Sequence, residues 1–69
     1  MRQEIKIRND IRYVLRIFDT PQNWVAAEVL MYDNKTYQPN EHQPYGPSKF
    51  MGSVNFGTVK EAMSEWESL

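Results

Sequence analysis

The stretch Ile5–Ile17, with the sequence IKIRNDIRYVLRI, decides the fold of this 69-residue chain. Apolar residues alternate with polar ones on either side of Asn9-Asp10, a dipeptide typical of turns. Most of the apolar residues are β-branched or aromatic, which favours strands over helices. The stretch therefore predicts a β-hairpin that turns at Asn9-Asp10.

The length of this hairpin loop decides which side chains share a face. A loop of three residues pairs Ile7 with Ile11. Ile5 then lies opposite Tyr13, and the apolar residues of both strands gather on one face. A loop of two residues pairs Ile7 with Arg12 instead and divides the apolar residues between the two faces. Because a single apolar face can be buried as a core, we expect the three-residue loop.

Residues 21–32 are compatible with either a strand or a helix. Thr20-Pro21 could begin a helix, but residues 33–35 are typical of a hairpin turn and residues 36–37 of its return strand. We therefore expect a strand that pairs with the second strand of the hairpin. The expected pairs are Ile17 with Asn23, Leu15 with Val25, Tyr13 with Ala27, and Ile11 with Val29.

The second half of the chain contains a proline-rich segment, a strand pattern and a helix pattern. Residues 38–48 hold three of the four prolines, so we expect a surface loop, of a length that is often functional. Residues 49–56 return to the alternation of a strand. Thr58 and Glu61 form a capping-box pattern, which predicts a C-terminal helix. Its apolar side chains recur at helical spacing and are Val59, Ala62, Met63 and Trp66.

These elements predict one α+β domain that spans residues 1–69. Its architecture is an antiparallel β-meander of four to five strands with one C-terminal helix packed on one face. A chain of this length buries only about 60% of its unfolded surface, so its stability is marginal. The apolar face that the helix is expected to cover is formed by Ile5, Ile7, Ile11, Tyr13, Leu15, Ile17, Val25, Val29 and Met31.

The composition argues against most kinds of catalytic chemistry. The chain has no cysteine and one histidine, His42, which excludes thiolate and multi-histidine metal sites. Its three glycines lack the spacing of a phosphate-binding loop. We therefore expect no enzyme activity, no cofactor and no bound metal. No apolar run has the length of a membrane span, and the lack of cysteine fits a cytoplasmic location.

The face opposite the helix is the predicted interaction surface. In the expected register Arg12 faces Glu28 and Arg16 faces Trp24. Such pairs are common on an ordinary solvent-exposed face, but an aromatic and apolar set of this size favours an interface. The predicted contact residues are Arg12, Arg16, Phe18, Trp24, Leu30 and Tyr32.

This surface predicts a small non-enzymatic protein-interaction module. We expect it to act as a regulator, adaptor or inhibitor by occupying a site on a larger protein. The same face could instead join two copies of the chain in a homodimer. A cysteine-free chain of this size would suit an accessory protein of a bacterium or a phage.

The alternative is a single-stranded or duplex nucleic-acid-binding domain. Residues 1–18 carry five basic and two acidic residues, a net charge of +3, whereas residues 19–69 carry a net charge of -4. Basic residues interleaved with aromatic ones can bind phosphates and stack bases. The total charge of -1 and Glu28 in the middle of the face weigh against this alternative. Its candidate residues are Arg2, Lys6, Arg8, Arg12 and Arg16.

Overall fold

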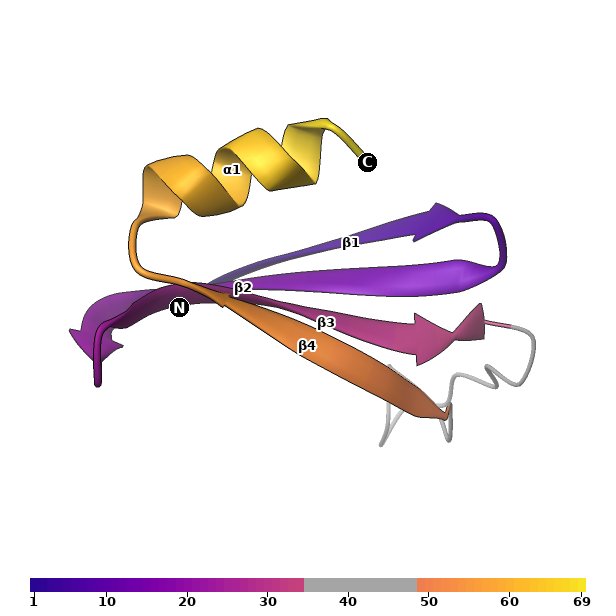
Figure 1. The fold of residues 1–69 in the computed structure, drawn as a ribbon, viewed down its shortest axis with the longest axis horizontal. Coiled ribbons are helices and arrows are strands. Elements are labelled where there is room, and N and C mark those ends of the chain that lie inside the picture. The colour runs from indigo at the N-terminus through magenta and orange to yellow at the C-terminus, as the bar shows by residue number, and fades with distance from the viewer. Residues whose placement is uncertain (35–48) are drawn as a thin grey trace.

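The chain folds into a four-stranded antiparallel sheet and one helix in a computed structural model that describes residues 1–34 and 49–69. The strands follow one another in the order β1-β2-β3-β4, which confirms the predicted α+β meander (Figure 1). The elements are β1 (Arg2–Arg8), β2 (Ile11–Gln22), β3 (Val25–Asp33), β4 (Phe50–Phe56) and α1 (Val59–Glu67).

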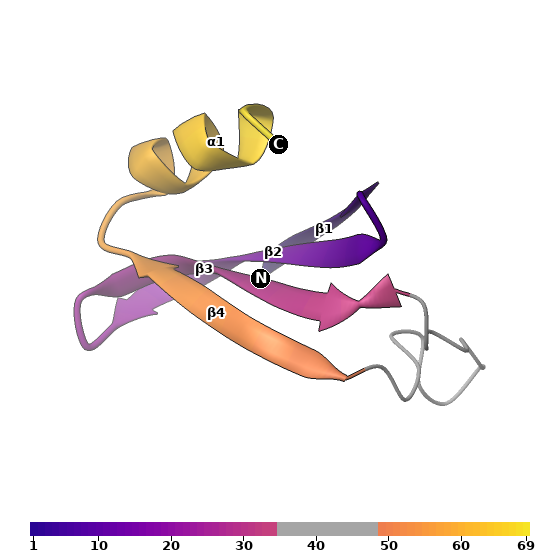
Figure 2. The same ribbon diagram turned by 45° about the vertical axis from the view of Figure 1, so that its right-hand side comes forward.

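The helix covers one side of the sheet, and no second helix or strand of residues 1–34 and 49–69 lies on the other side (Figures 1 and 2). We call the covered side the helix face, which carries Tyr13, Leu15 and Val29, and the other the open face, which carries Arg12, Val14 and Arg16. The β1–β2 turn and the β2–β3 turn lie at opposite ends of the sheet. The buried core is formed by Leu15, Ala27, Val29, Ala62 and Trp66.

The C-terminal helix begins and docks largely as predicted. The Thr58 hydroxyl accepts the backbone N–H of Glu61 at 3.1 Å, which satisfies one of the unpaired donors of the first turn. Ala62 and Trp66 are buried against the sheet, and Met63 packs beside them. Val59 does not join this core, because it lies at the first position of the helix and is 39% exposed.

The first hairpin turns through two residues and not through the three that we expected. Arg8 pairs with Ile11, and Ile7 pairs with Arg12. Asn9 and Asp10 have φ angles of 51° and 61°, as in a type I′ turn, which matches the right-handed twist of the strands. Asn and Asp tolerate this left-handed region better than other residues with a side chain. The turn therefore sets the register and overrides the apolar pattern.

In this register each side chain of β1 lies on the opposite face of the sheet from the one that we predicted. Ile5 and Ile7 lie on the open face, where they are 47% and 49% exposed, and not in the core that we predicted. Lys6, which we expected on the open face, lies on the helix face. Its Nζ donates to the Trp66 carbonyl at 2.7 Å and lies 5.1 Å from the centre of the Trp66 ring. The charged side chains of β1 thus border the helix layer.

The segment after the first hairpin is a strand, as we preferred, but its register differs from the expected one by four residues. Leu15 pairs with Val29 and Ile17 with Ala27. The shift is even, so the faces of β2 and most of β3 are those predicted. The end of β2 is irregular, because the pairing shifts between Ile17 and Gln22 and resumes with Gln22 opposite Val25.

Some predictions fall on residues outside the described part of the chain. They are the return strand at residues 36–37 and the surface loop at residues 38–48, which includes His42. Within residues 1–34 and 49–69, no helix has both the length and the apolar character that crossing a membrane requires.

Candidate functional site

The β2–β3 turn carries the most exposed large apolar side chain of the described residues. Gln22 pairs with Val25, so Asn23 and Trp24 alone form the turn. Trp24 is 93% exposed. An isolated exposed apolar residue needs no explanation, but a tryptophan has the largest apolar surface of any side chain and here buries almost none of it.

The backbone of this turn makes the position of Trp24 unfavourable as well as exposed. The φ angles of Asn23 and Trp24 are 50° and 71°. A left-handed conformation costs a residue with a β-carbon roughly 1–2 kcal/mol, which is why glycine is preferred at the second central position of such turns. The conformational free-energy cost at Trp24 is therefore not offset by burial of its side chain. Such outliers concentrate at functional sites.

The backbone of the turn lies close to the link between β4 and α1. The carbonyl oxygen of Trp24 faces Gly57, where an added β-carbon would lie 3.5 Å from this oxygen. Gly57 is in the link between β4 and α1, at the same end of the sheet (Figure 1). The contact places the Trp24 backbone next to the start of the helix and leaves its side chain in solvent.

A shallow hollow lies beside the turn. It has a volume of about 220 Å³ and is lined by Phe18, Gln22, Asn23, Val25, Glu28 and Asn55. Its walls come from β2, β3 and β4 and combine apolar surface with amide and carboxylate groups. The hollow therefore presents both apolar and polar groups beside the turn.

Arg16 connects the hollow to the middle of the open face. Its Nη1 donates to Oε1 of Glu28 at 3.0 Å, and its guanidinium lies 5.7 Å from the centre of the Phe18 ring. The side chain of Glu28 is 19% exposed. Arg16 is thus held in a defined position by an opposite charge and an aromatic ring, although we had expected it to face Trp24.

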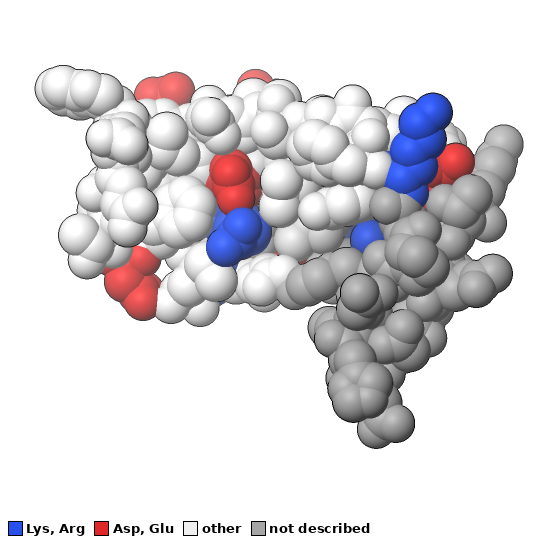
Figure 3. Space-filling view, turned by 90° about the horizontal axis from the view of Figure 1, so that it is seen from below, with Lys and Arg blue, Asp and Glu red and all other residues white. Residues whose placement is uncertain are grey.

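The middle of the open face is more buried than we predicted. Arg12 is 1% exposed, and its guanidinium lies 4.8 Å from the centre of the Tyr32 ring. Val14 is also 1% exposed. Tyr32 in turn makes an edge contact with Phe50 of β4, with ring centres 5.5 Å apart. The part of this face that stays visible in Figure 3 is largely uncharged, with charged side chains at a few separate places.

The predicted contact residues therefore separate into two groups. Phe18 and Arg16 lie near the β2–β3 end, which also carries Trp24. Arg12, Leu30 and Tyr32 form a more buried region further along the strands. Trp24 is a turn residue and not a member of the sheet face, because the expected register placed the turn too early.

The basic residues of the first hairpin do not form one surface. Lys6 is bonded to the helix carbonyl, Arg12 is buried, and Arg16 pairs with Glu28. Arg2 Nη2 donates to Glu4 at 3.3 Å, and Arg8 Nη1 donates to the Ile7 carbonyl at 2.8 Å. A phosphate-binding stripe needs cations that project from one side, and these project from both.

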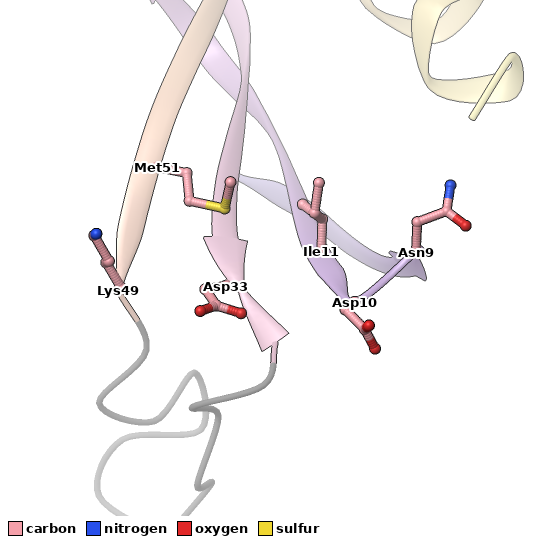
Figure 4. A pocket seen from close by; sticks show the side chains of 6 residues that line it. All are labelled: Asn9, Asp10, Ile11, Asp33, Lys49 and Met51. Carbon is pink, nitrogen blue, oxygen red and sulfur yellow. The ribbon is translucent and has the colours of Figure 1, made fainter.

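A hollow of about 320 Å³ lies at the opposite end of the sheet, beside the first turn. Figure 4 shows its lining, Asn9, Asp10, Ile11, Asp33, Lys49 and Met51. The carboxylates of Asp10 and Asp33 point in different directions and do not converge on one point. No group of three or more metal-binding side chains is found among the residues that the structure describes.

Two features of the site were missed by reasoning from the sequence. Phe50 contacts Tyr32 on the open face, a pairing that depends on the irregular register between β3 and β4. The second is the turn position of Trp24. Asn23 was the available signal, because asparagine favours the first central position of a type I′ turn.

Comparison with known proteins adds no constraint on this site. No protein-family model matches the sequence, and no curated protein or solved structure is detectably similar to it.

Proposed function

We propose that the chain is a non-enzymatic protein-interaction module whose principal contact is Trp24. It occupies a site on a larger protein and acts there as a regulator, adaptor or inhibitor. The observation that carries the proposal is the combination, in one residue, of 93% exposure and a φ angle of 71°. A tryptophan in this state lowers the stability of the free domain, whereas buried in a partner's pocket it becomes a strong anchor.

The surroundings of Trp24 support a protein partner. The adjacent hollow offers apolar, amide and carboxylate groups, and Arg16 and Phe18 lie beside it in fixed positions. Aromatic residues and arginine are the side chains that dominate protein interfaces. Arg12, Leu30 and Tyr32 then support the contact region from the middle of the open face. The proposal assigns this binding to the cytoplasm, which is compatible with the lack of cysteine.

The test compares how substitutions in the two turns affect the binding of partner proteins to the whole chain. The tagged wild-type chain, the Trp24→Gly variant and the Asp10→Gly variant are each incubated with extract of the source cells, and captured protein is then purified and titrated. Both glycine variants keep a turn that favours positive φ. We expect Asp10→Gly to bind like wild type and Trp24→Gly to bind at least about tenfold more weakly.

Two outcomes would contradict the proposal. The first is a captured protein that binds Trp24→Gly and wild type equally. The second is binding of a single-stranded oligonucleotide that weakens steeply with salt and is lost in Arg16→Glu but kept in Trp24→Gly, because salt dependence of this kind indicates phosphate contacts.

A further inference from the structure

The two edges of the sheet differ in how they are protected. Along β4 the pairing with β3 is irregular between Met31 and Tyr32, and Gly52 has a φ of 147°. Such a bulge bends an edge strand and discourages further pairing. Along β1 the pairing is continuous from Arg2 opposite Ile17 to Arg8 opposite Ile11. Strand β1 is therefore the regular edge.

Alternate residues of β1 direct their backbone groups away from β2, toward the position that a further strand would take. A two-residue turn is closed by a hydrogen-bonded pair, here Arg8 and Ile11. The even-numbered residues of β1 consequently bond to β2, and the backbone groups of Gln3, Ile5 and Ile7 point away from the sheet. The Ile7 carbonyl agrees with this, because it accepts the Arg8 side chain at 2.8 Å.

The side chains of β1 are self-complementary. On the open face Ile5 and Ile7 are about half exposed. On the helix face Glu4 and Lys6 have opposite charges, and Glu4 is 42% exposed. A two-fold axis at Ile5 places Ile5 opposite Ile5 of a second copy and Glu4 of each copy opposite Lys6 of the other. Opposite charges in such cross-strand pairs stabilise a sheet, and like charges destabilise it.

The charges select this register over its neighbours. Residues whose backbone groups point away from the sheet must pair with one another across the two β1 strands. The alternative registers are therefore those that keep odd-numbered residues opposite odd-numbered residues. In the nearest register on one side, the two-fold axis lies at Glu4 and places Glu4 opposite Glu4. In the nearest register on the other side, it lies at Lys6 and places Lys6 opposite Lys6. The register at Ile5 also places Arg2 opposite Arg8, but only at the ends of the strand, where both side chains are exposed.

We propose that two copies of this chain associate through their β1 edges in antiparallel register centred on Ile5, which forms one continuous eight-stranded sheet. The Lys6 ammonium has three donors, so it can keep the Trp66 carbonyl and also bind Glu4 of the other copy. The symmetry is that of an isologous dimer. Because β1 of the second copy runs in the opposite direction, the two Trp24 turns lie at opposite ends of the joined sheet and remain exposed.

The test uses charge reversal at the predicted pair. Sedimentation equilibrium is measured for wild type, Glu4→Lys, Lys6→Glu and an equimolar mixture of the two variants. Either variant alone has like charges at both pairs, and we expect its dimerisation to be at least about tenfold weaker than that of wild type. In the mixture every such pair is opposite again, so we expect the dimer to return. Glu67→Lys and Lys60→Glu make the same charge changes on exposed helix positions and should leave dimerisation unchanged.

Amide hydrogen exchange of wild type provides a second test that needs no substitution. The amides of Gln3, Ile5 and Ile7 should exchange more slowly as the protein concentration rises. Three results would overturn the inference: a wild-type chain that stays monomeric up to about 1 mM, the upper range for weak specific association; dimerisation that is indifferent to both charge reversals; or exchange of these three amides that does not depend on concentration. None of these results bears on binding through Trp24.

Discussion

The two tight turns of the sheet have similar φ angles and begin with the same residue type, asparagine, but differ in their second residue. Asn9-Asp10 joins β1 to β2 and Asn23-Trp24 joins β2 to β3, each with positive φ at both central residues. In the first turn both residues are of the kind that tolerates this conformation. In the second, a tryptophan occupies the position where glycine would be most stable. Stability alone accounts for the first turn but not for the second, which is why we propose Trp24 as the principal contact.

The largest expected effect concerns the strand that both turns share. Leu15 lies in the middle of β2 and is fully buried between the sheet and the helix. Leu15→Ala should lower the free energy of unfolding by about 2–5 kcal/mol because it leaves a cavity in the core. Urea unfolding followed by circular dichroism and by tryptophan fluorescence should give one coincident transition. Two separate transitions would mean that the two turns belong to parts of the protein that unfold independently, and their stabilities could then not be compared directly.

A smaller effect is expected when the first turn is given the Asn-Trp sequence of the second by the substitution Asp10→Trp. Asp10→Trp places a bulky side chain at a φ of 61° with no pocket designed to hold it. The free energy of unfolding should fall by up to about 1–2 kcal/mol, because Trp lacks the short polar side chain that lets Asp adopt the left-handed conformation at little cost. The Asp10 carbonyl, which accepts the backbone N–H of Asn34 at 2.9 Å, is retained in this variant. An unchanged or higher stability, measured by urea unfolding, would show that the turn does not discriminate between side chains.

The same comparison explains which parts of the structure could be predicted from the sequence. Alternation and the Thr58–Glu61 cap were sufficient for the strands and the helix, because periodicity and capping are local. The register of β1 was predicted wrongly, since Asn9-Asp10 favours a two-residue turn more strongly than the apolar pattern favours one core face.

The candidate site was predicted only in part for a related reason. Trp24, Phe18 and Arg16 were named from their chemistry, and the structure places Phe18 and Arg16 together. The position of Trp24 depends on the irregular pairing between Ile17 and Gln22, for which the sequence contains no periodic signal. The burial of Arg12 against Tyr32 also depends on the register of β2 and β3. Contacts between strands were therefore harder to predict than the strands themselves.

The role of Trp24 is tested by the free energies of unfolding of the Trp24→Gly and Asp10→Gly variants, measured side by side. Glycine removes the left-handed cost at both turns but adds entropy to the unfolded chain. We predict that Trp24→Gly is more stable than wild type by about 1 kcal/mol, whereas Asp10→Gly changes stability by only a few tenths of a kcal/mol, because Asp already tolerates the conformation. A Trp24→Gly variant less stable than wild type would contradict the account, because Trp24 would then stabilise the fold and need no partner to explain its place.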